Sequence, residues 1–226
     1  PKRRGVDSAQ MIWGNSVAIL TGDLIFSRAS LLVSELGTRP MKIQSQTFER
    51  LVLGQLFETT GPREGQDLLD HYIAVIEGKT GSLIAAAGEY GSLLSGASEE
   101  VISMVKAYGE LVGVAFQLAD DVIDIVSDGK TSGKTRGTDL REGVPTLPTI
   151  LLDRAVAAGD ESAIAVRALL DADLSSDAAL EAAVEALAAH PVTQEAWQIA
   201  YDWADRAIAA IAPLPESTAK AALESF

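Results

Sequence analysis

Three aspartates in an apolar helical stretch form the pattern with the clearest chemical meaning in this chain. Residues 116–124 read Phe-Gln-Leu-Ala-Asp-Asp-Val-Ile-Asp, so the carboxylates are Asp120, Asp121 and Asp124. On an α-helix Asp120 and Asp124 share one face, and Asp121 points about 100° to the side. Like charges at this spacing destabilise a helix by roughly 0.2–0.5 kcal/mol per pair, and burial increases the cost. We therefore expect a compensating positive charge beside them.

A divalent cation is the compensation that fits best. Magnesium prefers oxygen ligands and is usually held by one or two carboxylates, while water and phosphate oxygens take the other positions. The pattern therefore predicts Mg²⁺ bound together with a substrate diphosphate. Clustered aspartates near a helix end are also typical of a solvated surface or a helix cap. The metal interpretation thus depends on the motifs that accompany the cluster.

Composition narrows the class of protein. The chain has 226 residues, 47% of them hydrophobic, a net charge of −14 and no cysteine. The missing cysteines exclude disulfides and zinc-thiolate sites and fit a reducing cytoplasm. The acidic balance argues against a nucleic-acid surface, and no uninterrupted run of about 18 apolar residues indicates a membrane span. The sequence favours a cytoplasmic protein in which local cations bind anionic small molecules.

Helical periodicity runs through almost the whole chain, and no segment alternates as a strand does. Asp7 and Ser98 are expected to cap helices, and Gly78-Lys79-Thr80-Gly81 is expected to be a flexible turn. Residues 127–145 read as an irregular cationic loop. Helices are expected over 8–36 (broken at Gly14 and Gly22), 40–60, 66–77, 82–94, 98–126, 151–158, 162–171, 177–189, 193–211 and 216–225. The fold class predicted for residues 1–226 is a single all-α domain, a helical bundle around a central cavity.

Several motifs in a fixed order resemble those of the trans-isoprenyl diphosphate synthases. Lys79-Thr80 resembles the pair that contacts diphosphate in that family, and Gly22-Asp23 resembles another family signature. Arg3-Arg4-Gly5 resembles the arginine pair that follows the family's first aspartate-rich motif. Four further motifs together resemble the family's second aspartate-rich region. They are Phe116-Gln117, Asp120-Asp121-x-x-Asp124, Gly133-Lys134-x-x-Gly137-x-Asp139 and Thr146-Leu147-Pro148. Five signatures in the right order are more specific than any one of them.

The resemblance implies an isoprenoid synthase fold and a prenyltransferase reaction. An allylic diphosphate ionises, isopentenyl diphosphate attacks the cation in a 1'-4 condensation, and pyrophosphate is released. Family analogy assigns Mg²⁺ to the three aspartates and places Lys79, Thr80 and Lys134 on diphosphate oxygens. It places Gln117 near the reacting atoms and Arg3 or Arg4 on isopentenyl diphosphate. A homodimer is also implied, and segments 54–59 and 142–148 favour a medium- or long-chain polyprenyl product.

Two departures from the family pattern affect these expectations. The first aspartate-rich motif is expected upstream of Arg3, so half of the metal site would lie outside this sequence. Val144 stands where many members carry a lysine. We expect that lysine's part in phosphate binding to be absent or supplied by Arg136 or Arg141.

Other interpretations remain open on the sequence alone. A class I terpene cyclase also ionises a prenyl diphosphate, but it does not need cations such as Lys79 for a second diphosphate. A catalytically silent partner subunit would keep the fold, although it would not need three clustered carboxylates. Locally, Lys79-Thr80 also fits an ordinary turn, Arg3-Arg4 a solvated terminus and Asp139 a helix cap. His71 has no acidic or thiol partner at ligand spacing, so no role in a site is expected for it.

Overall fold

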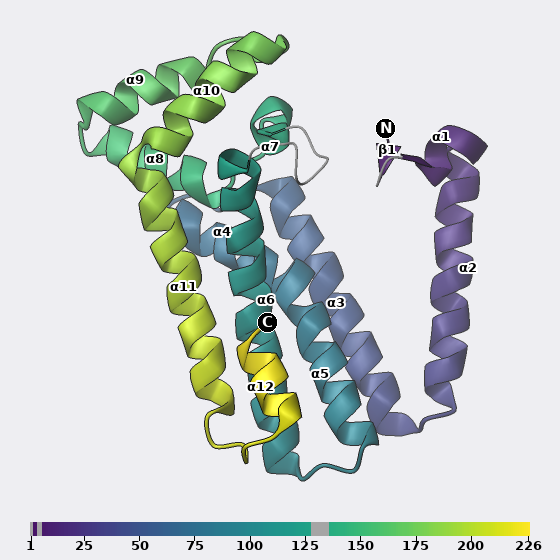
Figure 1. Cartoon of the computed structure of the whole chain (residues 1–226). Coiled ribbons are helices and arrows are strands. Elements are labelled where there is room, and N and C mark those ends of the chain that lie inside the picture. Colours follow the sequence, from purple (N-terminus) through teal and green to yellow (C-terminus); the bar gives the residue numbers. More distant parts are fainter. Residues whose placement is uncertain (1, 4–5, 128–135) are drawn as a thin grey trace. The chain divides into compact units, whose positions relative to one another are not determined.

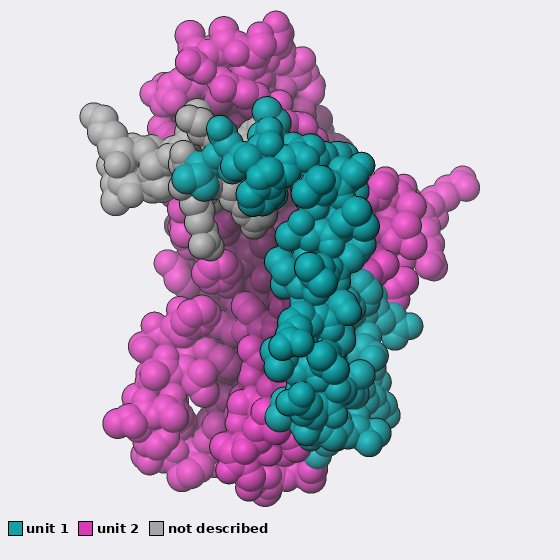
Figure 2. Space-filling model, turned by 90° about the vertical axis from the view of Figure 1, so that its right-hand side faces the viewer, with its two compact units in different colours: residues 1–49 teal, residues 50–226 magenta. Residues whose placement is uncertain are grey.

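The computed structural model describes residues 2–3, 6–127 and 136–226, with side chains from residue 6 onward. The described chain divides into two compact units, residues 1–49 and 50–226, which Figure 2 colours separately. Each unit is described by itself below. The sequence-based assignment of one domain to residues 1–226 stays a prediction.

The first unit is mostly helical and opens with a short hairpin. β1 (Lys2–Arg3) pairs antiparallel with β2 (Val6–Asp7), although the sequence predicted no strand. Two helices follow, α1 (Ala9–Trp13) and α2 (Asn15–Ser34), and then the first half of α3 (Thr38–Thr60). Gly14, at φ 80°, ends α1 as predicted, because glycine adopts this backbone conformation without strain. Gly22 lies inside α2 without breaking it, so the second predicted break was wrong.

The second unit confirms the all-α fold class. After α3 come α4 (Leu68–Ile76), a π-turn η1 (Glu77–Gly81), α5 (Ser82–Leu94) and α6 (Glu99–Val126) (Figure 1). The remaining helices are α7 (Thr138–Glu142), α8 (Leu147–Ala157), α9 (Glu161–Leu170), α10 (Asp177–Ala189), α11 (Pro191–Ile211) and α12 (Thr218–Glu224). α7 lies inside the segment predicted to be irregular, so that prediction was wrong for residues 138–142.

α6 is the central helix of this unit. Ser98 caps it as predicted, accepting a hydrogen bond from the Val101 backbone N–H at 3.4 Å. Its apolar residues recur on more than one face, so α5 packs along one side and α11 along another (Figure 1). Leu118, Val122 and Ile125 are almost completely buried in the largest core cluster, against residues of α8, α10 and α11. The aspartates therefore lie at the end of a firmly packed helix.

Two described helices are long and apolar enough to cross a membrane, judged by length and composition alone. They are α2 and α6. Both tolerate charged residues within the apolar window, which is why no uninterrupted apolar run was found in the sequence. The core helix of a folded domain meets the same criterion, and α6 is such a helix.

Candidate active site

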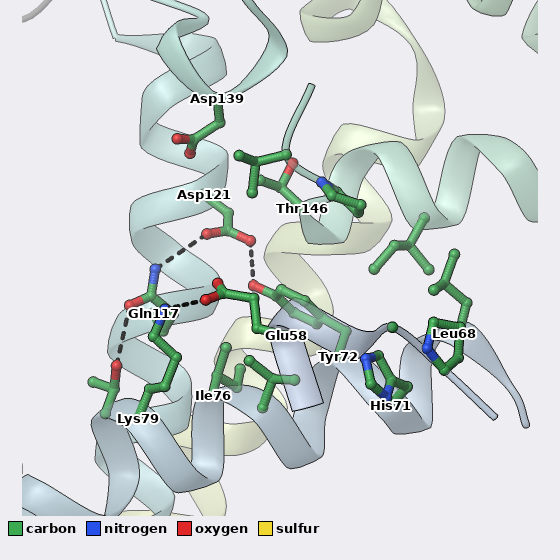
Figure 3. Close-up of a pocket in the computed structure, with 17 residues that line it drawn as sticks. Glu58, Leu68, His71, Tyr72, Ile76, Lys79, Gln117, Asp121, Asp139 and Thr146 are labelled. Atoms are coloured by element: carbon green, nitrogen blue, oxygen red, sulfur yellow. Dashed lines mark hydrogen bonds and ion pairs between the residues drawn. The ribbon is translucent and has the colours of Figure 1, made fainter. Parts of the chain in front are cut away.

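A pocket of about 290 Å³ in the second unit brings together four of the predicted site residues, Lys79, Thr80, Gln117 and Asp121. Figure 3 shows this pocket. This volume lies near the lower end of the range for small-molecule sites. Its walls combine a few converging polar groups with an apolar surface. The polar lining residues are Glu58, His71, Tyr72, Lys79, Thr80, Gln117, Asp121, Asp139 and Thr146, and the apolar ones include Leu68, Val75, Ile76, Val144 and Ile150.

Lys79 and Thr80 reach this pocket from a π-turn. The sequence predicted a flexible break at 78–81, and this was wrong. Instead, α4 continues through η1 directly into α5, so the three form one uninterrupted helical rod. A π-turn inserts one extra residue per turn and is often found at functional sites. Here it displays the lysine and the hydroxyl on rigid backbone.

Glycines on two neighbouring helices let the π-turn pack at backbone distance. A Cβ atom on Gly54 of α3 would lie 3.0 Å from the Lys79 backbone nitrogen, which is tighter than nine in ten real Cβ contacts. A Cβ atom on Gly113 of α6 would lie 2.7 Å from the Cα of Gly81, a distance that real Cβ atoms essentially never show. Because these positions carry no side chain, the backbone of η1 packs directly against α3 and α6, one helical turn from Gln117.

A partly buried ion pair supports the start of the same turn. The two terminal guanidinium nitrogens of Arg50 donate to the Glu110 carboxylate. One of them, Nη2, lies 2.6 Å from its carboxylate oxygen and also reaches the Glu77 carbonyl at 3.5 Å. The hydrogen bond to Glu110 raises the pKa of Arg50, whereas burial raises the pKa of the Glu77 carboxyl. Such bidentate contacts between a guanidinium and a carboxylate group are geometrically specific. They tie α3, α6 and the first residue of η1 together.

The polar groups of the π-turn already have partners within the pocket. The Lys79 ammonium pairs with the Glu58 carboxylate at 2.7 Å, and both side chains remain partly exposed. The Thr80 hydroxyl donates to the Gln117 side-chain carbonyl at 3.3 Å. An exposed pair of this kind contributes at most about 1 kcal/mol. A diphosphate could therefore displace Glu58 from Lys79 at low cost.

Asp121 is the only member of the predicted aspartate triad that lines the pocket, and it is 4% exposed. One carboxylate oxygen accepts from the Tyr72 hydroxyl and from the Leu147 backbone N–H at 3.0 Å. The other accepts from the Gln117 amide at 3.3 Å. Burial raises the pKa of Asp121 to about 6, and these three donors oppose the rise. Burial and the charge on Asp121 hold the pKa of Tyr72 well above its usual range, so its hydroxyl stays protonated and donates.

Asp120 and Asp124 have different surroundings. Asp120 is exposed, and Asp124, one turn further on, is half-buried and accepts from the Asp139 backbone N–H at 3.4 Å. Within the described ranges, no three His, Cys, Asp or Glu side chains are grouped so that they could hold a metal ion. Metal binding by the three aspartates stays a prediction. By accessibility, Asp120 and Asp124 fit a cation and Asp121 does not.

Some predicted residues cannot be placed in the site. Arg4 and Lys134 lie outside the described residues, and of Arg3 only the backbone in β1 is described. The roles assigned to these three side chains stay predictions. Asp139 lies in the first turn of α7, where Gly137 holds the cap position, and lines the pocket.

Sequence reasoning missed three polar residues of the pocket. Tyr72 and Lys79 are seven residues apart, and with Val75 and Ile76 they form one helical face. This spacing could have predicted that Tyr72 lies on the same side of the helix as Lys79. Glu58 stood in a family-like segment but was given no role. His71 was set aside for lack of a partner, yet it is buried in the pocket wall. No local pattern identifies such a wall residue.

Comparisons with known proteins agree with this geometry. The Polyprenyl synthetase family model matches residues 1–187. The chain is 42% identical to a nonaprenyl diphosphate synthase of Mycobacterium tuberculosis, over 99% of the chain and 66% of that protein. It is 32% identical to the octaprenyl diphosphate synthase of Escherichia coli, over 98% of the chain and 68% of that protein.

A solved structure extends the likeness to three dimensions. It is the geranylgeranyl pyrophosphate synthase of Corynebacterium glutamicum, complexed with calcium and isoprenyl diphosphate. It superposes with a TM-score of 0.84 at 41% identity, covering 96% of this chain and 67% of that one. The chain thus spans about two thirds of the length of these relatives. From its family model, its relatives and its fold, the chain belongs to the polyprenyl synthetase family.

Proposed function

We propose that this protein is a prenyltransferase that extends all-trans prenyl chains. Isopentenyl diphosphate condenses 1'-4 with an allylic diphosphate: the allylic carbon–oxygen bond breaks, a carbon–carbon bond forms, a proton leaves and pyrophosphate is released. One observation carries the proposal. Lys79, Thr80 and Gln117 converge in one pocket beside the aspartate-rich end of α6, in a member of the polyprenyl synthetase family.

The proposal includes a divalent cation, Mg²⁺, bound with the substrate diphosphate. The resemblance assigns it to Asp120, Asp121 and Asp124, and the accessible pair Asp120 and Asp124 offers the hard oxygen donors that Mg²⁺ prefers. A bound cation would stabilise the negative charge that develops on departing pyrophosphate. The Corynebacterium structure, complexed with calcium and isoprenyl diphosphate, supports a divalent ion in this role.

The chain's own side chains perform the remaining tasks in this proposal. Lys79 exchanges the Glu58 carboxylate for a diphosphate oxygen, and the Thr80 hydroxyl, which has one proton to donate, exchanges the Gln117 carbonyl for another. Gln117 lies within hydrogen-bond reach of both Thr80 and Asp121, so its amide is fixed beside the reacting atoms. The apolar wall excludes water from the carbocation. Lys134, Arg3 and Arg4 are assigned to diphosphate binding from the resemblance alone.

Val144 marks a departure from the family within the pocket wall. It is 38% exposed and lines the pocket where many members carry lysine. A lysine there would bring a second ammonium group toward the diphosphate. We expect Val144→Lys to lower the KM for diphosphate substrates by about threefold to tenfold, equivalent to about 0.7–1.4 kcal/mol. Steady-state kinetics against Val144→Met, an uncharged control, tests this expectation, and equal KM values in the two variants would refute it.

Product length, assembly and location complete the proposal. The nonaprenyl and octaprenyl synthases among the relatives support a medium- or long-chain product. A homodimer is supported by α2, none of whose residues is buried and which exposes eight large apolar side chains. They are Val17, Ile19, Leu20, Leu24, Ile25, Phe26, Leu31 and Leu32. The cysteine-free composition supports a cytoplasmic location.

A product assay tests the function. The full-length protein is incubated with Mg²⁺, radiolabelled isopentenyl diphosphate and a panel of allylic diphosphates, and the products are resolved by chain length. We expect a ladder that ends at a defined length. Pyrophosphate release from an allylic diphosphate alone, without incorporation of label, would indicate a cyclase. A folded protein that is inactive with every primer would indicate a silent subunit.

A further inference from the structure

Asp121 differs from its neighbours in the triad because it is the buried one and three protein donors converge on its carboxylate. Three donors from three different elements reach it: the Tyr72 hydroxyl of α4, the Gln117 amide of α6 and the backbone N–H of Leu147, the first residue of α8. A carboxylate offers about four lone-pair positions, so three are taken. Mg²⁺ binds oxygen at about 2.0–2.1 Å and demands near-octahedral geometry. Coordination by the oxygen that accepts from Tyr72 and Leu147 would require those protein donors to leave.

Two of those donors depend on the same oxygen. Leu147 is fully buried and begins a helix, so its N–H is one of the donors of the first turn that lack a partner within the helix. The partial positive charge at a helix N-terminus favours an anion in this place. Tyr72 and Leu147 both donate to this oxygen of Asp121. Moving it toward a cation would take the acceptor away from both donors inside the protein.

The network also reaches the groups proposed to act on substrate. Gln117 donates to Asp121 through its amide nitrogen and accepts from Thr80 through its amide oxygen. The amide is therefore held in one orientation, with the hydroxyl of η1 at its other end. The resulting chain of contacts runs from Thr80 through Gln117 and Asp121 to Tyr72. Figure 3 shows its part from Gln117 to Tyr72.

We propose that Asp121 is a positioning residue and not a metal ligand. Its carboxylate joins α4, α6 and the first turn of α8 and orients Gln117, while metal binding is left to Asp120 and Asp124. This inference refines the proposed function and rests on it for the assignment of Gln117. The hydrogen bonds of Asp121 with Tyr72, Gln117 and Leu147, called the aspartate joint below, exist whether or not the protein turns over prenyl diphosphates.

The test compares four variants of the full-length protein: Asp121→Asn, Tyr72→Phe, the double variant, and Asp120→Asn as the matched carboxylate control. The first readout is thermal unfolding in metal-free buffer. We expect Asp121→Asn and Tyr72→Phe each to lower the midpoint by roughly 4–8 °C. The double variant should lower it by clearly less than the two shifts added, because the residues share one hydrogen bond. Asp120→Asn should leave the midpoint unchanged.

The second readout is the Mg²⁺ concentration that gives half of the thermal stabilisation produced by inorganic pyrophosphate. We expect Asp120→Asn to raise it at least tenfold, and Asp121→Asn and Tyr72→Phe to change it less than twofold. The inference is overturned if Asp121→Asn raises this Mg²⁺ concentration as much as Asp120→Asn does and leaves the unfolding midpoint in metal-free buffer unchanged. If Asp121→Asn fails to fold, Tyr72→Phe decides, since an unchanged metal-free midpoint in that variant overturns the inference.

The two proposals fail in different ways. If Mg²⁺ and pyrophosphate do not stabilise even the unmodified protein, the proposed metal-dependent function is refuted. The non-additive loss of metal-free stability in the variants then still supports the joint formed by Asp121. Conversely, strictly additive shifts in an active enzyme would refute the joint and leave the function standing.

Discussion

Replacing Gly113 with alanine tests whether the close packing of η1 against α6 positions the site. The new Cβ atom would lie 2.7 Å from the Cα of Gly81 and 3.1 Å from its nitrogen. Ordinary contact begins at 3.4 Å, and both neighbours are backbone atoms that cannot rotate away. The two helices must therefore separate by about 0.7 Å.

The size of the effect follows from this separation and from a matched control. Overpacking of this kind costs about 1–3 kcal/mol, whereas alanine gains about 1 kcal/mol over glycine in a helix. Gly91 lies on α5, where an added methyl group would have nothing within 4 Å, so Gly91→Ala should show only the gain. The difference between the two variants isolates the packing cost, which corresponds to roughly 3–10 °C in unfolding midpoint.

Activity should respond more strongly than stability. The hydrogen bond from Thr80 to Gln117 is already 3.3 Å long, so a further displacement of η1 by about 0.7 Å would break it. Misplacement of about 1 Å can cost about a hundredfold in rate. We expect kcat/KM to fall at least tenfold in Gly113→Ala and not at all in Gly91→Ala. Equal unfolding midpoints and equal kinetics in the two variants would refute the packing argument.

Three further predictions concern single charges. Asp120→Ala should lower turnover by orders of magnitude while circular dichroism shows unchanged helicity, and unchanged turnover would exclude a metal role for Asp120. Lys79→Gln should raise the KM for diphosphate substrates about tenfold, whereas Lys106→Gln, which removes a similar ion pair on α6, should not. A hydrogen bond from Arg154 lowers the pKa of Asp67 in the folded protein below the unfolded value of 3.8. The stabilisation by this bond is therefore present above pH 3.8 and is lost as the pH falls through the folded-state pKa of Asp67. Urea unfolding should therefore show a shallower acid decline for Asp67→Asn, and identical pH curves would contradict the assignment.

Local sequence signals predicted many of the helices well, because several of their boundaries have a local cause. Ser98 caps α6 through its own side chain, and Gly61 ends α3 with φ 75°. Amphipathic periodicity located α6 itself, including its acidic end. These signals act within a few residues along the chain, so they can be read without knowledge of the fold.

The largest error in the secondary structure has a tertiary cause. Gly78 and Gly81 bracket Lys79 and Thr80, and by local preference such a segment is a flexible turn. In the fold, these glycines permit close approach to α3 and α6, and the helix continues as a π-turn. The glycines supply space for neighbouring backbone, and only the packed structure shows which neighbours use it.

Site composition shows the same distinction between local and tertiary information. The resemblance identified Lys79, Thr80, Gln117 and Asp121, all of which line one pocket. It treated the three aspartates as equivalent, because a motif records residue types and spacing. Helical geometry already placed Asp121 about 100° from Asp120 and about 60° from Asp124, and the structure shows that this direction leads to α4 and α8. Partners so distant in sequence cannot be read from the motif.

One physical requirement connects the π-turn with the aspartate joint. A site that ionises a diphosphate needs donors that are oriented before charge develops, because reorientation during the reaction raises the barrier. Thr80 is fixed by backbone packing from Gly54 and Gly113, and Gln117 is fixed by Asp121. The hydrogen bond between Thr80 and Gln117 links these two supports. Weakening either support should therefore disturb the same donor pair, so the effects of Gly113→Ala and Asp121→Asn on kcat are expected to be less than additive.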